Sequence, residues 1–147
     1  LKEQLYLLCS QYISNREAAA KTMIADIREA VANETKSSAG DKYETSREMM
    51  QQEIEQHMAR LNELHKMRTL LQHISTTHTA ATVMPGAVVY TNNGNYYVAI
   101  SAGQLTIDGT NYYAISAASP IGTQLMGKTA GATIILNGKS FVVEKVV

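Results

Sequence analysis

Cysteine, proline, phenylalanine and tryptophan are scarce in this chain of 147 residues. It has one cysteine (Cys9), two prolines, one phenylalanine and no tryptophan. A single cysteine excludes an internal disulfide, so nothing in the sequence indicates an oxidising compartment. The neighbours of Cys9 are mostly apolar, and we interpret it as a packing residue rather than a nucleophile.

The chain also has no net charge at neutral pH. The chain has 13 Lys and Arg against 13 Asp and Glu, so charge alone does not indicate a nucleic-acid or membrane partner. Residues 1–80 carry 10 basic and 11 acidic side chains, whereas residues 81–147 carry only 3 and 2. Such a change in composition predicts two domains. Because no apolar run could span a membrane and the start lacks a signal-peptide pattern, we expect a cytoplasmic protein without a membrane partner.

Glycine and proline are absent from residues 1–36 and from about residue 45 to residue 74. In both stretches apolar residues recur mostly at spacings of three, four and seven, which predicts one apolar stripe on each of two helices. The first stripe comprises Leu5, Leu8, Tyr12, Ile13, Ala20, Ile24, Ile27 and Val31; the second comprises Met50, Ile54, Met58, Leu61, Leu64, Met67, Leu71 and Ile74. We expect an antiparallel coiled-coil hairpin over residues 1–74, with its tip near residues 35–45.

The spacing changes in the last part of the chain. Residues 75–85 are rich in Thr and Ala and end at Pro85, which predicts a linker. Within residues 86–147, short β-prone runs alternate with turn signals. The clearest turn signals are Asn92–Asn95, Asp108-Gly109 and Asn137-Gly138. Ser119-Pro120 predicts the start of a short helix that ends at Gly127. We expect about six strands and one helix, and therefore an α+β protein.

Two segments carry a family resemblance. The block Ser119-Pro120-Ile121-Gly122, Leu125-Met126-Gly127-Lys128 and Gly131, with Tyr113–Ser116 before it and Gly138 and Phe141–Val143 after it, is similar to the C-terminal domain of the Gre family of transcript-cleavage factors. The segment Gly40-Asp41-Lys42-Tyr43-Glu44 resembles the Gly-Asp-x-x-Glu tip of that family. The order of hairpin and C-terminal domain also matches. The resemblance implies an FKBP-like fold for residues 86–147.

The resemblance also implies a function. A Gre-like factor binds RNA polymerase, inserts its hairpin tip into the secondary channel and stimulates cleavage of backtracked RNA. It is an accessory factor rather than an enzyme, and it meets the nascent RNA 3′ end and the DNA-bound elongation complex only through the polymerase. Ser119, Pro120 and Ile121 would face the polymerase. Asp41 and Glu44 would assist catalysis by sharing a Mg²⁺ ion inside the complex.

Elementary chemistry agrees with a shared metal. Hydrolysis at a two-metal site needs one ion at the attacking water and one at the leaving oxygen. Two carboxylates are too few to hold Mg²⁺ tightly, so we expect no cofactor in the free protein. Two structural alternatives stay open. Asp41 and Glu44 also form a helix-capping box, with Thr45 and Glu48 as a competing cap. Pro120 and Ile121 also suit the domain's own core.

Two other functions remain possible on these residues. One is a regulator that occupies the secondary channel without stimulating cleavage. The other is a coiled-coil interaction protein with no role in transcription. The sequence cannot separate the first of these from a cleavage factor, because both can have an acidic tip. The coiled-coil stripes do not help, because such stripes occur in many unrelated proteins.

The remaining charged and aromatic residues give weaker signals. His57, His65 and His73 are eight residues apart, too far to share a zinc ion within one helical turn, and solvated or seam-edge positions are expected. Arg16, Lys21, Arg28 and Lys36 form either a basic flank that meets RNA or the polymerase channel, or an ordinary solvated face. Prolyl isomerase activity is not expected, because such a pocket needs clustered aromatic side chains.

Overall fold

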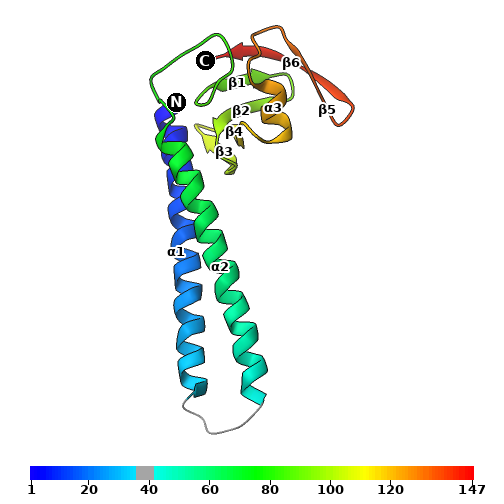
Figure 1. The fold of residues 1–147 in the computed structure, drawn as a ribbon. Coiled ribbons are helices and arrows are strands. Elements are labelled where there is room, and N and C mark those ends of the chain that lie inside the picture. Colours follow the sequence, from blue (N-terminus) through cyan, green and yellow to red (C-terminus); the bar gives the residue numbers. More distant parts are fainter. Residues whose placement is uncertain (36–41) are drawn as a thin grey trace. The chain divides into compact units, whose positions relative to one another are not determined.

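The computed structural model describes residues 1–35 and 42–147. Two long helices, α1 (Lys2–Thr35) and α2 (Lys42–Gln72), run antiparallel to each other (Figure 1). The strands and the third helix follow: β1 (Val88–Thr91), β2 (Gly94–Ala99), β3 (Gly103–Ile107), β4 (Thr110–Ser116), α3 (Pro120–Leu125), β5 (Thr133–Leu136) and β6 (Lys139–Val146). This order confirms the expected α+β class, with a helical hairpin before a six-stranded sheet and one short helix.

The described chain divides into two compact units. One contains Leu1–Tyr12 and Arg68–Val147, and the other contains Ile13–Met67. The first unit therefore combines the sheet with the beginning of α1 and the end of α2. The second unit is the part of the hairpin beyond them. None of the helices in residues 1–35 and 42–147 is long and apolar enough to cross a membrane.

An apolar seam holds the second unit together. Ile24 and Ile27 of α1 are buried with Ile54 of α2, and Val31, Met50 and Leu61 pack beside them. Most of the predicted stripe is confirmed. The assignment of Met58 to it is wrong, because the Met58 side chain is 51% exposed. In a supercoiled helix pair the core positions alternate between spacings of three and four. Two successive spacings of four, from Met50 through Ile54, carry Met58 off the seam.

The sheet has the strand order β3-β4-β2-β1-β6-β5. Neighbouring strands are antiparallel except β2 and β4, which are parallel, with Tyr96 opposite Tyr113. Both predicted two-residue turns are present. Asp108-Gly109 and Asn137-Gly138 have positive φ angles at both positions, as a type I′ hairpin requires. Asn and Asp tolerate this left-handed conformation better than other side chains, which explains their position before glycine.

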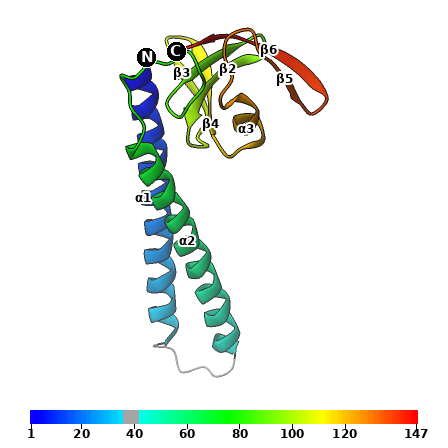
Figure 2. The same cartoon turned by 45° about the horizontal axis from the view of Figure 1, so that its top comes forward.

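One face of the sheet packs against α3 (Figure 2). The buried cluster on this face consists of Val83, Ala87, Val89, Tyr96, Val98, Leu125, Ile134, Phe141 and Val143. Val83 comes from the segment predicted as a linker, and it is only 2% exposed. Its N–H donates to the carbonyl of Lys128, and its carbonyl accepts from the N–H of Gly127, each at 2.9 Å. The connecting segment is thus hydrogen-bonded to the residues that follow α3.

Residues on the opposite face approach the start of α1. Tyr97 is fully buried, and burial, together with nearby Cys9 and Tyr6, raises the pKa of its hydroxyl. Cys9 is also fully buried, and burial raises the pKa of its thiol to about 12. A thiolate is therefore very scarce at neutral pH, which agrees with the interpretation of Cys9 as a packing residue.

Candidate docking surface and hairpin tip

The Ser119-Pro120 pair begins α3 as the sequence predicts. Ser119 has an extended backbone, with φ −67° and ψ 160°, and its Oγ accepts a hydrogen bond from the N–H of Gly122 at 3.0 Å. The same hydroxyl donates to the carbonyl of Ser116 at 2.7 Å. Pro120 occupies the first helical position, where a missing N–H costs nothing. The helix start is therefore fixed to the end of β4 by one side chain.

Gly122 has a packing reason for being glycine. A Cβ atom added there would lie 2.0 Å from the carbonyl oxygen of Ser116 and 2.9 Å from Oγ of Ser119. Neither partner can move without breaking the cap, because they are hydrogen-bonded to each other. The Ser-Pro-Ile-Gly block thus forms a tight connection between β4 and α3.

Gly131 also serves the domain's backbone. It has a φ of 94°, a region that favours glycine, and its N–H donates to the carbonyl of Val143 at 2.7 Å. Together with the contacts of Gly127 and Lys128 to Val83, this bond gives most of the block an architectural role. Only the exposed residues of the block are available to contact a partner.

Pro120 and Ile121 are placed differently. Pro120 is exposed, whereas Ile121 is half-buried and packs against the core cluster beside α3. The interpretation of Ile121 as a core residue therefore has direct support, and Pro120 is the residue whose side chain a partner can reach. Its exposed neighbours are Ala118, Thr123 and Gln124. The helix start displays a small uncharged surface, which we call the docking surface: Ala118, Pro120, Thr123 and Gln124.

The hairpin tip is only partly described. Asp41 lies outside the described residues, and the backbone of Glu44 lies in the first turn of α2, which begins at Lys42. Thr45 is inside the helix, so the competing cap by Thr45 and Glu48 is wrong.

The basic residues of α1 do not form one flank. Arg16 lines a groove with His57 and Arg60, whereas Lys21 and Arg28 line another groove with Met58. The two grooves share no residue, since on a helix the side chain at position 16 points roughly 120° away from that at position 28. Lys36 lies outside the described residues.

The histidines occupy the positions that the sequence suggests. His57 is half-buried at the edge of the seam, and His65 and His73 are exposed. In the part of the chain that the structure describes, no three His, Cys, Asp or Glu side chains gather where they could hold a metal ion.

Sequence reasoning missed an aromatic cluster. The Tyr96 ring lies 6.0 Å from that of Tyr113 and 6.4 Å from that of Phe141, measured between centroids. We expected no cluster of aromatic side chains because tryptophan and phenylalanine are scarce, and we did not take tyrosine into account. The Tyr96-Tyr97 and Tyr112-Tyr113 pairs, on two β-prone runs, are the signal that was available. Tyr96 and Phe141 are buried in the core, which makes this cluster a packing feature.

Two solved structures are similar to the chain. The crystal structure of GreA factor homolog 1 (Gfh1) of Thermus thermophilus matches with 19% identity over 97% of this chain and 94% of that chain, at a TM-score of 0.34. A second structure, described as that of the transcription factor Gfh1, matches with 18% identity over 96% and 92%, at a TM-score of 0.33. No protein-family model matches, and neither does any curated protein. Similarity at this level carries no functional argument by itself.

Proposed function

We propose that this protein is a Gre-type transcription elongation factor that binds RNA polymerase in the cytoplasm. It docks through its β domain, of the FKBP-like kind, and places its hairpin tip in the secondary channel of the enzyme. The observation that carries the proposal is the helix start at Ser119-Pro120. The block that resembles the Gre family forms a rigid turn there and leaves Pro120 exposed.

The docking surface has properties that suit a protein partner. Its position on a capped helix start means that little conformational entropy is lost on binding. None of its four residues is charged, so a partner can cover them without desolvating an ion. Ser119 holds the turn rather than contacting the partner, because both hydrogen-bonding roles of its hydroxyl are already used within the domain. Ile121 supports Pro120 from the core side.

In the hairpin tip, Asp41 and Glu44 would act in trans. Inside the polymerase they would complete the shell of a weakly held Mg²⁺ ion and orient the attacking water. The hydrolytic centre belongs to the polymerase, and this chain supplies no enzyme activity of its own. Capping of α2 and assistance of the metal are compatible, since a carboxylate has four acceptor positions.

Docking can be tested with one charged substitution and a matched control. We expect Ala118→Lys and Pro120→Ala each to weaken binding to the cognate RNA polymerase at least tenfold, whereas Gln104→Lys on β3 leaves it unchanged. Ala118 and Gln104 are both exposed, so neither change disturbs the core. Fluorescence anisotropy of the labelled protein measures affinity, and circular dichroism verifies folding. Folded variants at positions 118 and 120 that bind like the unaltered protein would remove this surface from the interface.

A further inference from the structure

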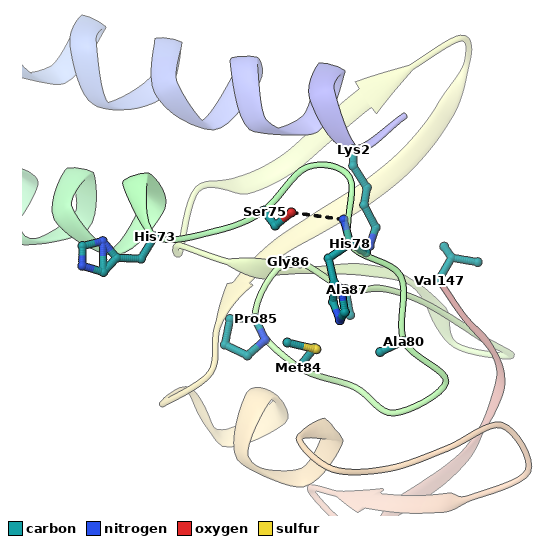
Figure 3. Close-up of a pocket in the computed structure, with 10 residues that line it drawn as sticks. All are labelled: Lys2, His73, Ser75, His78, Ala80, Met84, Pro85, Gly86, Ala87 and Val147. Carbon is teal, nitrogen blue, oxygen red and sulfur yellow. Dashed lines mark hydrogen bonds between the residues drawn. The ribbon is translucent and has the colours of Figure 1, made fainter.

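A cavity of about 600 Å³ lies within the first compact unit, away from the docking surface. Lys2 of α1, His73 beyond the end of α2, and the segment that connects α2 to β1 form its walls (Figure 3). Neither the family resemblance nor the proposed function uses any of these residues. The cavity is large enough for a small ligand.

The polar side chains that line this cavity include one cation, the ammonium group of Lys2. Lys2, His73 and His78 supply an ammonium group and two imidazoles, and no Asp or Glu side chain is among the lining residues. The Nζ atom of Lys2 donates to the backbone carbonyl of His78 at 2.7 Å. In Figure 3 the Lys2 side chain descends to His78, while His73 stands apart at the rim. Desolvation by burial lowers the pKa of Lys2, so its charge would gain from a neighbouring anion.

The cavity wall is held in place by its own hydrogen bonds. The Oγ atom of Ser75 accepts from the N–H groups of Thr77 and His78, at 3.2 and 3.1 Å. These bonds fix the turn that presents the His78 carbonyl to Lys2. Further along, the N–H of Gly86 donates to the carbonyl of Val98 in β2 at 2.7 Å. A Cβ at Gly86 would lie 3.0 Å from Ile74, so the segment passes close behind the wall.

The remaining lining is apolar. Met84, Pro85 and Ala87 contribute uncharged side chains to the lining. A ligand that combines an oxyanion with an apolar body would use both parts. Phosphate fits the cationic part, since a lysine ammonium binds it as a point charge and an imidazole N–H can add a hydrogen bond.

We propose that this cavity binds a phosphate group, either free or carried by a small molecule with an apolar body. Lys2 is the principal contact and His78 the second, while Met84 and Pro85 face the body of the ligand. The proposal is independent of the role in transcription, because the docking surface and the hairpin tip contribute no residue to this site.

Calorimetric titration of the full chain with inorganic phosphate, adenosine monophosphate and adenosine tests the proposal. We expect one saturable site for at least one phosphate-bearing probe and none for adenosine. Tighter binding of the monophosphate than of phosphate would assign a ligand with an apolar body, and equal binding would assign the free ion. Saturable binding of adenosine as tight as that of its monophosphate would overturn the proposal, as would no binding of either phosphate probe below about 10 mM.

Variants locate the site. Lys2→Gln should weaken phosphate binding at least tenfold and Lys2→Arg should retain most of it, whereas Lys66→Gln is the control. Lys66 is exposed on α2 and pairs with Glu63 of the same helix, at 3.2 Å. His78→Gln, at an exposed side chain, provides a second variant that should weaken binding without affecting folding. Equal loss in Lys66→Gln and Lys2→Gln would show non-specific attraction and refute the site.

Discussion

Single residues explain why the Ser119–Gly131 block has its sequence. The cap by Ser119 and the first-turn position of Pro120 follow local rules and could be predicted from the sequence. The requirement for glycine at position 122 could not, because it depends on where the end of β4 places the carbonyl of Ser116. The sequence shows glycine at position 122, but only the tertiary packing explains why glycine is required there.

At this scale we expect Gly122→Ala to destabilise the β domain by about 1–3 kcal/mol, the usual cost of overpacking a tight site. The added methyl group would meet the Ser116 carbonyl oxygen, which the Ser119 hydroxyl holds in place. Urea unfolding followed by tyrosine fluorescence measures the change. Gln124→Ala, at an exposed position of the same helix, should shift stability by less than about 0.5 kcal/mol. Equal stabilities of the two variants would refute the packing argument.

Helices, strands and turns are the scale at which the sequence was most informative. Missing glycine and proline delimit α1 and α2, and the Asp-Gly and Asn-Gly pairs mark both type I′ turns. These signals are local, because the conformation of a helix or a tight turn depends mainly on the residues within it. The exposure of Met58 was missed. It depends on how the helix supercoils around its partner, which a spacing of four residues does not reveal.

A pair of variants tests that correction in the hairpin. Ile54→Ala should cost about 2–5 kcal/mol, because Ile54 is 5% exposed and lies in the seam cluster with Ile24 and Ile27. Met58→Ala should cost less than about 0.5 kcal/mol. Circular dichroism at the helical band during urea unfolding measures both. If the substitution at Met58 costs as much as that at Ile54, the seam runs through position 58 after all.

At the scale of the whole molecule, the sequence predicts the kinds of parts better than their connections. β2 pairs in parallel with β4, although β3 lies between them in the sequence, and no local sequence pattern predicts this pairing. The segment expected as a linker contributes Val83 to the core, and Val83 hydrogen-bonds to Gly127 and Lys128 just after α3. The phosphate cavity depends on this same segment, since His78, Met84 and Pro85 meet Lys2 only in the folded chain.

The central claim combines the docking surface on the β domain with carboxylates in the hairpin turn. If it is correct, substitutions at these two places have different effects. A change at the docking surface removes binding and activity together, whereas a change at Asp41 or Glu44 removes activity alone. A channel-occupying regulator without cleavage activity would instead bind the polymerase and release no RNA fragment. A coiled-coil interaction protein unrelated to transcription would not bind it.

The most direct measurement is the release of RNA 3′ fragments from backtracked elongation complexes of the cognate polymerase, with saturating protein and Mg²⁺. We expect the unaltered protein to accelerate release at least tenfold over the polymerase alone. Asp41→Ala and Glu44→Ala should each abolish the acceleration while binding the polymerase within about twofold of the unaltered protein, a difference of about 0.4 kcal/mol. Acceleration that survives both substitutions, or polymerase binding by the unaltered protein without any acceleration, would contradict the account.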